Sequence, residues 1–211
     1  MTERVFVFGA SGHGKVVIDT VRRAGYDNAI VVDDDPQCRG GCVLGIAVVG
    51  TRDNLLEYRC PNLVGIVAIG SNRSRLAVAH WLTEQGFRFL KVIDPTATVS
   101  SSALIGEGSL VVAHGVVNAE AHIGKHVIVN TAATVDHDCI VDDGVHLGPG
   151  VHLCGGVHIG EGAFIGAGSV VVPGVRVGPW AVVGAGSTVL ADLPAGVRAA
   201  GSPCRILEPM A

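Results

Sequence analysis

The chain has 211 residues, of which 48 % are hydrophobic, enough for one or two compact domains with buried cores. Glycine accounts for 30 residues, whereas aromatic residues make up only 4 % and charged residues 16 %. This composition excludes intrinsic disorder, because disordered chains are poor in aliphatic residues and rich in charge. The formal net charge of −4 offers no basic surface for a nucleic acid.

The segment MTERVFVFGASG at the N-terminus carries an early acidic residue and leads straight into a strand-like stretch, unlike a signal peptide. The chain contains no run of 18 uncharged apolar residues, so no membrane-spanning helix is predicted. The 6 cysteines form no CxxC pair, which argues against a disulfide framework and a zinc site. These features predict a cytoplasmic protein without a metal site.

The first ninety residues alternate between segments with strand-like and helix-like hydrophobic patterns. Such alternation is typical of a small parallel sheet with helical crossovers, and it predicts a Rossmann-like α/β domain. The predicted strands are residues 4–9, 29–35, 63–70 and 87–93, and the predicted helices are residues 15–25 and 71–86.

The composition changes abruptly near residue 92. Within residues 93–190 the only Phe, Trp or Tyr residues are Phe164 and Trp180, and the only Lys or Arg residues are Lys125 and Arg176. From Ile93 the chain can be written in sixes without an insertion. The first position of each six is Ile, Val or Leu, and the fifth is Ala, Ser, Gly, Cys or Val. A period of six is a known β-helix repeat.

Physically, each six is a short strand followed by a corner, and three sixes make one triangular coil. The aliphatic first residue points inward beside the small fifth residue, and coils stack at about 4.8 Å by strand pairing. Residues 93–190 are therefore predicted to form a little over five coils of a narrow prism that excludes aromatic side chains. The predicted organisation is an α/β domain at 1–92, a parallel β-helix at 93–190 and a C-terminal segment at 191–211.

Beyond the repeat, the chain contains GASGHGKVV, DDD after the second strand, AIGSNRSR, NTAATVDHDC and GSPCR. This combination resembles the hexapeptide-repeat acyltransferases, and within them the bacterial sugar-nucleotide N-acetyltransferases. The resemblance implies a left-handed β-helix, acetyl-CoA as co-substrate and a homotrimer. It also implies acetylation of a UDP-, dTDP- or GDP-linked 4-amino-4,6-dideoxysugar, with a GDP-linked perosamine-type sugar as first choice.

The N-terminal glycine-rich turn has the GxxxxGK spacing of a P-loop, but Val16 stands where Ser or Thr would ligate magnesium. ATP hydrolysis is therefore not expected. Backbone N–H groups at a helix start bind phosphates, and Ser11, Gly12 and His13 are predicted to bind the nucleotide. The alternative is a tight strand-to-helix turn without a ligand.

Three acids close the second predicted strand at the carboxyl edge of the sheet, where ligands of open α/β sheets bind. The resemblance implies that acids here touch the base or ribose, and Asp33 and Asp34 are the candidates. A solvated acidic turn is the alternative for at least one of the three. Gly70 follows the third strand at the same edge and is predicted to line the substrate site, unless it is only a turn glycine.

His137 lies two residues after an inward Val135, at an outward-facing corner of the predicted coil. Acetyl transfer to an amine needs a base, and histidine suits that role near neutral pH. A carboxylate on its second ring nitrogen would fix the tautomer, and Asp138 and Asp136 both lie within reach. We predict His137 and Asp138 as catalytic, against the alternative of a surface histidine. Cys139 occupies an inward fifth position and is not expected to be a nucleophile.

His146, His152 and His158 are six residues apart and suggest a metal site at first sight. Successive sixes occupy different faces of the prism, so one chain is not expected to bring them to one ion. His152 and His158 are predicted to lie on a solvated face.

The resemblance implies residues for acetyl-CoA as well. His146 is expected to contact its thioester end, with Gly155 and Ala167 lining the pantetheine path by backbone contacts. Arg205 in GSPCR is expected near the phosphates, where Cys204 replaces the alanine usual in the family. A solvated basic residue is the alternative for Arg205.

Three functions remain open from the residues. The first is N-acetylation of an amino sugar carried by a nucleotide. The second is O-acetylation of a sialic acid or another sugar, which shares every motif of the β-helix. The third is a non-catalytic β-helix trimer, against which the His137–Asp138 pair counts.

Overall fold

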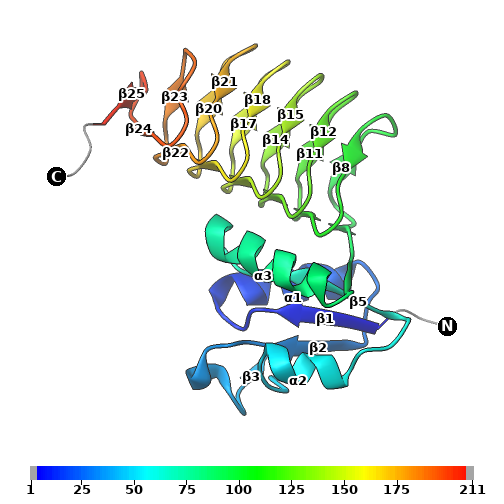
Figure 1. The fold of residues 1–211 in the computed structure, drawn as a ribbon. Coiled ribbons are helices and arrows are strands. Elements are labelled where there is room, and N and C mark those ends of the chain that lie inside the picture. Colours follow the sequence, from blue (N-terminus) through cyan, green and yellow to red (C-terminus); the bar gives the residue numbers. More distant parts are fainter. Residues whose placement is uncertain (1–3, 208–211) are drawn as a thin grey trace.

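The computed structural model describes residues 4–207 and consists of an α/β unit packed against a β-helix (Figure 1). The α/β unit has a four-stranded parallel sheet in the order β2-β1-β5-β6, which confirms the predicted Rossmann-like domain. Its strands are β1 (Arg4–Phe8), β2 (Ala29–Val32), β5 (Leu63–Val67) and β6 (Arg88–Phe89). Its helices are α1 (Gly12–Arg23), α2 (Arg52–Glu57) and α3 (Asn72–Glu84).

Two details of the α/β unit differ from the prediction. The segment 87–93 is not one strand, because the chain turns at Leu90 from the sheet into the β-helix. The Leu90 N–H donates to the Gly65 carbonyl of the sheet, whereas the Val92 N–H donates to the Ser109 carbonyl of the β-helix. Residues 36–62 also contain elements too short for periodicity to reveal: α2, the 3-10 helix η1 (Pro36–Cys38), and the hairpin of β3 (Cys42–Val43) and β4 (Ile46–Ala47).

The β-helix is a three-sided prism whose coils repeat every 18 residues, as the pairing of Leu110 with Ile128 shows. The first face contains, in spatial order, β25 (Arg205–Ile206), β24 (Arg198–Ala200), β22 (Val182–Val183), β19 (Phe164–Ile165), β16 (His146–Leu147), β13 (Ile128–Val129), β10 (Leu110–Val111) and β7 (Val92–Ile93). The second face contains β23 (Thr188–Val189), β20 (Val170–Val171), β17 (His152–Leu153), β14 (Thr134–Val135), β11 (Val116–Val117) and β8 (Thr98–Val99). The third face contains β21 (Arg176–Val177), β18 (His158–Ile159), β15 (Ile140–Val141), β12 (His122–Ile123) and β9 (Leu104–Ile105).

The predicted inward positions form the core of the prism. First-position residues such as Val129 and Leu147 and fifth-position residues such as Cys139 and Ala163 are fully buried in one hydrophobic cluster. The register predicted from the repeat is therefore confirmed.

The prism has about six coils, one more than the count of sixes predicted. The extra strand is β24 in the C-terminal segment, which continues the first face although its sequence lacks the hexad pattern. Val182 pairs with Arg198 after 16 residues instead of 18, and β25 then turns back antiparallel. The use of residues 191–211 as a separate functional unit stays a proposal.

The α/β unit packs on the first face of the prism. The outward side chains of Leu110 and Ile128 are buried in one cluster with Val5 and Val7 of β1 and with Val17 of α1. Because this cluster spans both units, the carboxyl ends of the sheet strands are held at a fixed place beside the first face. Within residues 4–207, no helix has the length and apolarity that crossing a membrane requires.

Candidate active site

His137 lies at the edge between the second and third faces, in the corner that follows β14. Its Nδ1 lies 2.7 Å from Oδ2 of Asp138, and its side chain is 61 % exposed. The hydrogen bond to Asp138, together with the charge of Asp136, raises the pKa of His137 above its ordinary value of 6.5. With Nδ1 held by a carboxylate, Nε2 is the nitrogen that can accept a proton.

Asp136 has a different task at this corner. Its Oδ1 accepts the backbone N–H of His137 at 2.8 Å and the side-chain amide of Asn118 at 3.0 Å. These hydrogen bonds lower the pKa of Asp136, so it stays ionised. Of the two acids considered from the sequence, Asp138 therefore pairs with the imidazole ring, and Asp136 binds the backbone N–H of His137.

Gly155 lies one coil further along the same edge. A Cβ at this position would lie 2.6 Å from both Cε1 and Nε2 of the His137 ring, so the ring packs directly against the Gly155 backbone and a larger residue would displace it. The backbone N–H of Gly156 also donates to the His137 carbonyl at 2.9 Å. A predicted catalytic residue and a predicted acetyl-CoA residue thus meet on one edge.

Cys139 is fully buried and donates to the carbonyl of Cys154 at 3.1 Å. Burial raises the pKa of its thiol above the ordinary value of 9.0, which disfavours the nucleophilic thiolate. The predicted inward position of Cys139 is confirmed.

A second cluster lies where the sheet meets the first face. Nδ1 of His146 is 3.4 Å from the Gly70 carbonyl, and its Nε2 is 3.2 Å from the side-chain nitrogen of Asn130. The rings of His13 and His146 lie 6.0 Å apart, centroid to centroid. Residues predicted for the nucleotide and for acetyl-CoA are thus brought together.

Both histidines of this second cluster are electrically neutral near pH 7. Burial first, and the charge of Arg75 second, lower the pKa of His13 and of His146 to about 4 each. Nε2 of His13 is buried and has no hydrogen-bond partner among the described residues. His13 therefore brings an uncommitted ring nitrogen to the junction of the two units.

The glycine-rich turn is a tight strand-to-helix turn whose polar groups remain accessible. It is tight, because a Cβ on Gly14 would collide with the Gly9 carbonyl. Ser11 and Gly12 are nevertheless exposed, and the Ser11 side chain makes no capping hydrogen bond to α1. Their polar groups are therefore accessible at the start of the helix.

The three acids after β2 are bound within the chain and do not form a purely solvated turn. Asp33 accepts the Ala10 N–H at 2.6 Å and the Asp35 N–H at 2.8 Å. Asp34 accepts the backbone N–H of Arg52 at 2.9 Å and forms an ion pair with its guanidinium. Asp33 thereby fixes the glycine-rich turn against the second strand.

Ala167 and the segment GSPCR lie at the edge between the first and second faces. Ala167 accepts the Gly186 N–H at 2.8 Å, and the Gly201 N–H donates to Ser187 in the neighbouring turn at 3.2 Å. Arg205 is exposed and donates to the adjacent Cys204 carbonyl at 2.9 Å. Within one chain, these acetyl-CoA candidates thus lie on a different edge from Gly155.

His146, His152 and His158 lie on three different faces, as predicted. His152 is exposed and lies 2.9 Å from the Thr134 hydroxyl, in accord with its predicted place on a solvated face. His158 is half-buried and pairs with Asp142 at 2.9 Å. Among the residues that the structure describes, no three His, Cys, Asp or Glu side chains are arranged to hold a metal ion.

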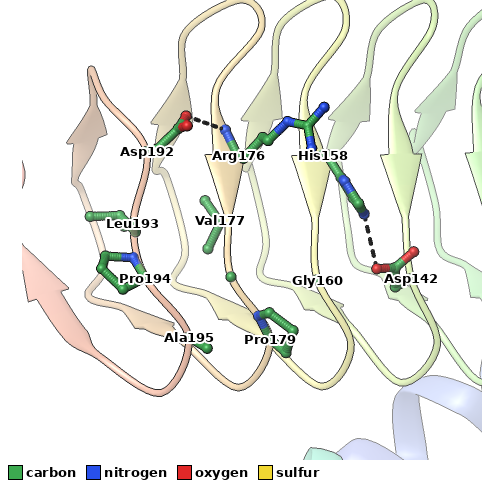
Figure 2. A pocket seen from close by; sticks show the side chains of 11 residues that line it. Asp142, His158, Gly160, Arg176, Val177, Pro179, Asp192, Leu193, Pro194 and Ala195 are labelled. Carbon is green, nitrogen blue, oxygen red and sulfur yellow. Dashed lines mark hydrogen bonds and ion pairs between the residues drawn. The ribbon is translucent and has the colours of Figure 1, made fainter.

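Figure 2 shows the hollow of about 400 Å³ in which the His158–Asp142 pair lies, at the C-terminal end of the third face. Its other polar contact joins the Arg176 backbone N–H to Asp192 at 2.7 Å. The remaining wall is apolar and includes Pro179 and Pro194. None of the predicted site residues lines this hollow.

Arg75 is a site residue that the sequence analysis did not select, although it lies in the AIGSNRSR motif. Its fully buried guanidinium donates to the carbonyls of Ile69 and His126 at 2.9 Å and of Gly144 at 2.8 Å. Asn72, bound to Arg75 at 2.8 Å, donates to the Gly162 carbonyl one coil further at 3.0 Å. Together they fix α3 along consecutive coils of the prism.

Topology separates the two clusters within one chain. The first face carries His146, and the edge between the second and third faces carries His137. In a three-sided prism that edge lies opposite the first face. One chain therefore does not place the His137 base beside its own nucleotide-type edge.

Comparison with known proteins identifies the family. Residues 4–82 match the PglD N-terminal domain, and residues 156–191 match the bacterial transferase hexapeptide (six repeats). Over 112 residues the chain is 37 % identical to UDP-N-acetylbacillosamine N-acetyltransferase of Bacillus subtilis; the match covers 53 % of this chain and about half, 52 %, of that protein.

Solved structures match over nearly the whole chain. The acetyltransferase domain of PglB from Neisseria gonorrhoeae, in complex with acetyl coenzyme A, is 41 % identical with a TM-score of 0.92, over 98 % of this chain and 100 % of that one. PerB from Caulobacter crescentus, in complex with CoA and GDP-perosamine, is 43 % identical with a TM-score of 0.92, over 98 % of each chain. The chain belongs to the hexapeptide-repeat sugar-nucleotide N-acetyltransferases. Membership in this N-acetyltransferase family confirms the resemblance seen in the sequence and the left-handed β-helix.

Proposed function

We propose that the protein transfers the acetyl group of acetyl-CoA to the 4-amino group of a nucleotide-linked 4-amino-4,6-dideoxysugar. The observation that carries the proposal is the exposed His137–Asp138 pair beside Gly155, in a chain that belongs to this family. The pair supplies a base whose pKa is raised by its carboxylate partner, and the glycine lets the ring lie against the backbone of the next coil.

In the proposed mechanism Nε2 of His137 takes the proton that the sugar amine loses as it attacks the thioester carbonyl. A C–N bond forms, the C–S bond breaks, and CoA leaves as the thiol after protonation. Asp138 holds the other ring nitrogen and stabilises the imidazolium. Backbone N–H groups stabilise the oxyanion, as is general for acyl transfer. No covalent bond to the enzyme forms, and buried Cys139 takes no part.

We propose further that the protein acts as a homotrimer in which one subunit supplies His137, Asp138 and Gly155. A neighbouring subunit then supplies its nucleotide-type edge with Ser11, Gly12, His13, Asp33, Asp34 and Gly70, and Ala167, His146 and Arg205 for acetyl-CoA. The separation of the two clusters on opposite sides of one prism supports this arrangement, because a complete site requires a second chain.

For the nucleotide sugar, a GDP-linked perosamine-type substrate remains our first choice. PerB was solved with GDP-perosamine and matches over 98 % of this chain, whereas the match to the UDP-sugar enzyme of Bacillus subtilis covers 53 %. UDP- and dTDP-linked 4-amino sugars are the competing substrates. Turnover of a panel of all three, together with sialic acid as an O-acetyl acceptor, decides between them, and turnover of sialic acid alone contradicts N-acetylation.

The catalytic assignment is tested with His137→Ala and the control His152→Ala, which removes an exposed histidine on the neighbouring strand. We expect His137→Ala to lower kcat by about 10²–10⁴-fold with an unchanged oligomer, as for loss of a general base. The His152→Ala control is expected to keep its kcat. A near-normal rate for His137→Ala would refute the assignment. Failure of CoA to raise the melting temperature would favour a non-catalytic β-helix.

A further inference from the structure

Both aromatic residues of the prism, Phe164 and Trp180, border the same cleft. It measures about 290 Å³ and lies between the start of α3 and the first face. The narrow core of the prism excludes aromatic rings, so these two side chains are placed outside it. The cleft is lined by Gly70, Ser71, Asn72, Arg73, Gly162, Phe164, Trp180 and Val182.

Trp180 occupies a backbone position that favours glycine. In the two preceding coils the equivalent corner residues are Gly144 and Gly162, each with φ of 65°, whereas Trp180 itself has φ of 60°. A bulky residue in the left-handed region carries a conformational cost and is often found where a function retains it. The Trp180 ring lies flat over Gly162, where a Cβ would come within 2.5 Å of it.

A cation completes this wall of the cleft. The Arg73 guanidinium lies 4.3 Å above the Trp180 ring centroid, and Arg73 is exposed. No carboxylate within residues 4–207 forms an ion pair with Arg73. On the other side, the Phe164 ring meets the His146 ring edge-on at 5.2 Å. Gly162 covers one face of the Trp180 ring and Arg73 covers the other, so the cleft presents the Phe164 ring and a guanidinium held on Trp180.

We propose that this cleft is a nucleotide subsite, in which a base packs against Phe164 and the outer face of the Arg73 guanidinium, and a phosphate pairs with the edge of that guanidinium. Aromatic faces bind bases of any sequence by stacking, and guanidinium groups bind phosphates by charge-assisted hydrogen bonds. The inference rests on the proposed function, because both of its substrates carry a nucleotide. The sources are the nucleotide of the sugar substrate and the 3′-phosphoadenosine diphosphate of CoA.

Position connects the cleft to the rest of the site. Gly70 lines the cleft and also bonds to His146, so the cleft adjoins the cluster at the carboxyl edge of the sheet. Phe164 and Trp180 lie on the coils that follow His146 towards the C-terminus, on the side of the prism where GSPCR ends the chain's last coil. A ligand that reaches from His146 along the first face would pass this cleft.

Binding is measured by tryptophan fluorescence in a Trp81→Phe background, which leaves Trp180 as the single tryptophan. The probes are CoA, adenosine 3′,5′-bisphosphate, UDP, dTDP and GDP. We expect saturable quenching by at least one probe and a roughly tenfold weaker affinity for it in Arg73→Gln, in line with the loss of a charged contact. Quenching by CoA and the bisphosphate assigns the cleft to CoA, and quenching by UDP, dTDP or GDP assigns it to the sugar nucleotide. The absence of quenching by every probe overturns the proposal.

Kinetics provide a second measurement with Trp180→Gly, which introduces the residue found at the equivalent corners 144 and 162 and is therefore expected to fold. The KM of one substrate should rise roughly tenfold, as for loss of the ring that holds the Arg73 guanidinium in place, with little change in kcat. Trp81→Phe is the matched control, because Trp81 also lies under an arginine, Arg52, at 5.1 Å, but outside the cleft. An unchanged KM for both substrates in Trp180→Gly contradicts the inference.

The two readouts separate this inference from the proposed function. Nucleotide quenching of Trp180 without acetyl transfer to any amino sugar supports the cleft and rejects the proposed reaction. Acetyl transfer without quenching, and with normal KM values in Trp180→Gly, supports the reaction and rejects the cleft.

Discussion

The imidazole of His137 lies directly beside the Cα of Gly155, so closely that a Cβ on Gly155 would fall 2.6 Å from Nε2. The ring is held from behind by Asp138 at 2.7 Å. The base thus has a fixed hydrogen-bond partner on one side and a backbone without a side chain on the other. This relationship predicts that activity is sensitive to a single methyl group next to the ring.

Gly155→Ala should lower kcat by up to about 100-fold, because a misplacement of about 1 Å is enough for such a loss. The melting temperature should change little, since the side chain that must move is exposed. Gly124→Ala is the control: its Cβ would meet the Asp143 backbone of the next coil at 2.8 Å, away from His137. That variant should lose stability and keep the kcat of its folded fraction. An unaltered kcat in Gly155→Ala would show that the ring has another productive position.

The fall of kcat/KM at acid pH should follow the protonation of His137. Only its neutral form accepts a proton, and Asp138 and Asp136 raise its pKa, so kcat/KM is lost as the pH falls through that raised pKa. Asp138→Asn should move the acid limb to lower pH and also lower kcat, because the ring loses its orienting carboxylate. Asp136→Asn should shift the limb in the same direction while kcat is largely kept. Equal kcat losses in both variants would contradict the separate roles of the two acids.

Stability should fall on mild acidification because of buried neutral histidines. The pKa values of His13, His126 and His146 are each lowered to about 4 from 6.5, with burial as the main cause. Between these values the unfolded chain binds more protons than the folded one, so stability rises with pH and is lost as pH falls from about 6.5 towards 4. The slope is at most about 1.4 kcal/mol per pH unit for each histidine.

His126→Asn tests this at one position, since Asn tolerates the left-handed backbone of residue 126, where φ is 54°. Urea unfolding at pH 5 and at pH 7 should show a smaller difference in the free energy of unfolding for the variant than for the parent. An identical pH dependence would mean that His126 is not kept neutral.

Arg75 should be among the most sensitive positions for stability. Arg75→Met would leave carbonyls of both units without their donor, and we expect a loss of about 3–5 kcal/mol, as for disruption of a buried charged network. Arg22→Gln is the control, since Arg22 also donates to a carbonyl, that of Leu44, but on the surface. It should cost less than about 0.5 kcal/mol. Comparable losses for the two variants in urea unfolding would contradict the role given to Arg75.

Cys139→Ala should retain near-normal kcat, because the thiol faces the core and its pKa is raised by burial. A modest fall in melting temperature is expected from the small cavity left behind. Loss of activity in a folded Cys139→Ala protein would argue for a covalent intermediate after all.

The prism could be predicted from sequence because its code is local and repeated. The aliphatic first residue of each six, such as Val129 or Leu147, sets the register of every coil, and the same count places His137 at an outward corner. The docking of α3 could not be predicted in this way. Arg75 binds backbone carbonyls some fifty and seventy positions further along the chain. Because every residue has a carbonyl, the sequence does not show which ones accept these hydrogen bonds.

The same distinction between local and long-range contacts applies to the site. The Asp138 partner of His137 is its neighbour in sequence, so the spacing suggests this pair. That Asp136 binds the backbone and not the ring follows only from its hydrogen bonds in the structure. The meeting of His13 with His146 depends on how the two units pack. The place of Trp180 at a corner, outside the narrow core, likewise follows only from the coiled structure.

The 18-residue coil also limits how the length of this protein can vary. A single inserted residue within the prism would turn the inward side chains that follow it outward, because neighbouring strand positions face opposite sides. Insertion of a complete coil would preserve the faces and lengthen the prism by about 4.8 Å. The distance between His137 and the final turn can therefore change only in steps of one coil. Relatives that accommodate longer or shorter substrates along the prism would be expected to differ by whole coils.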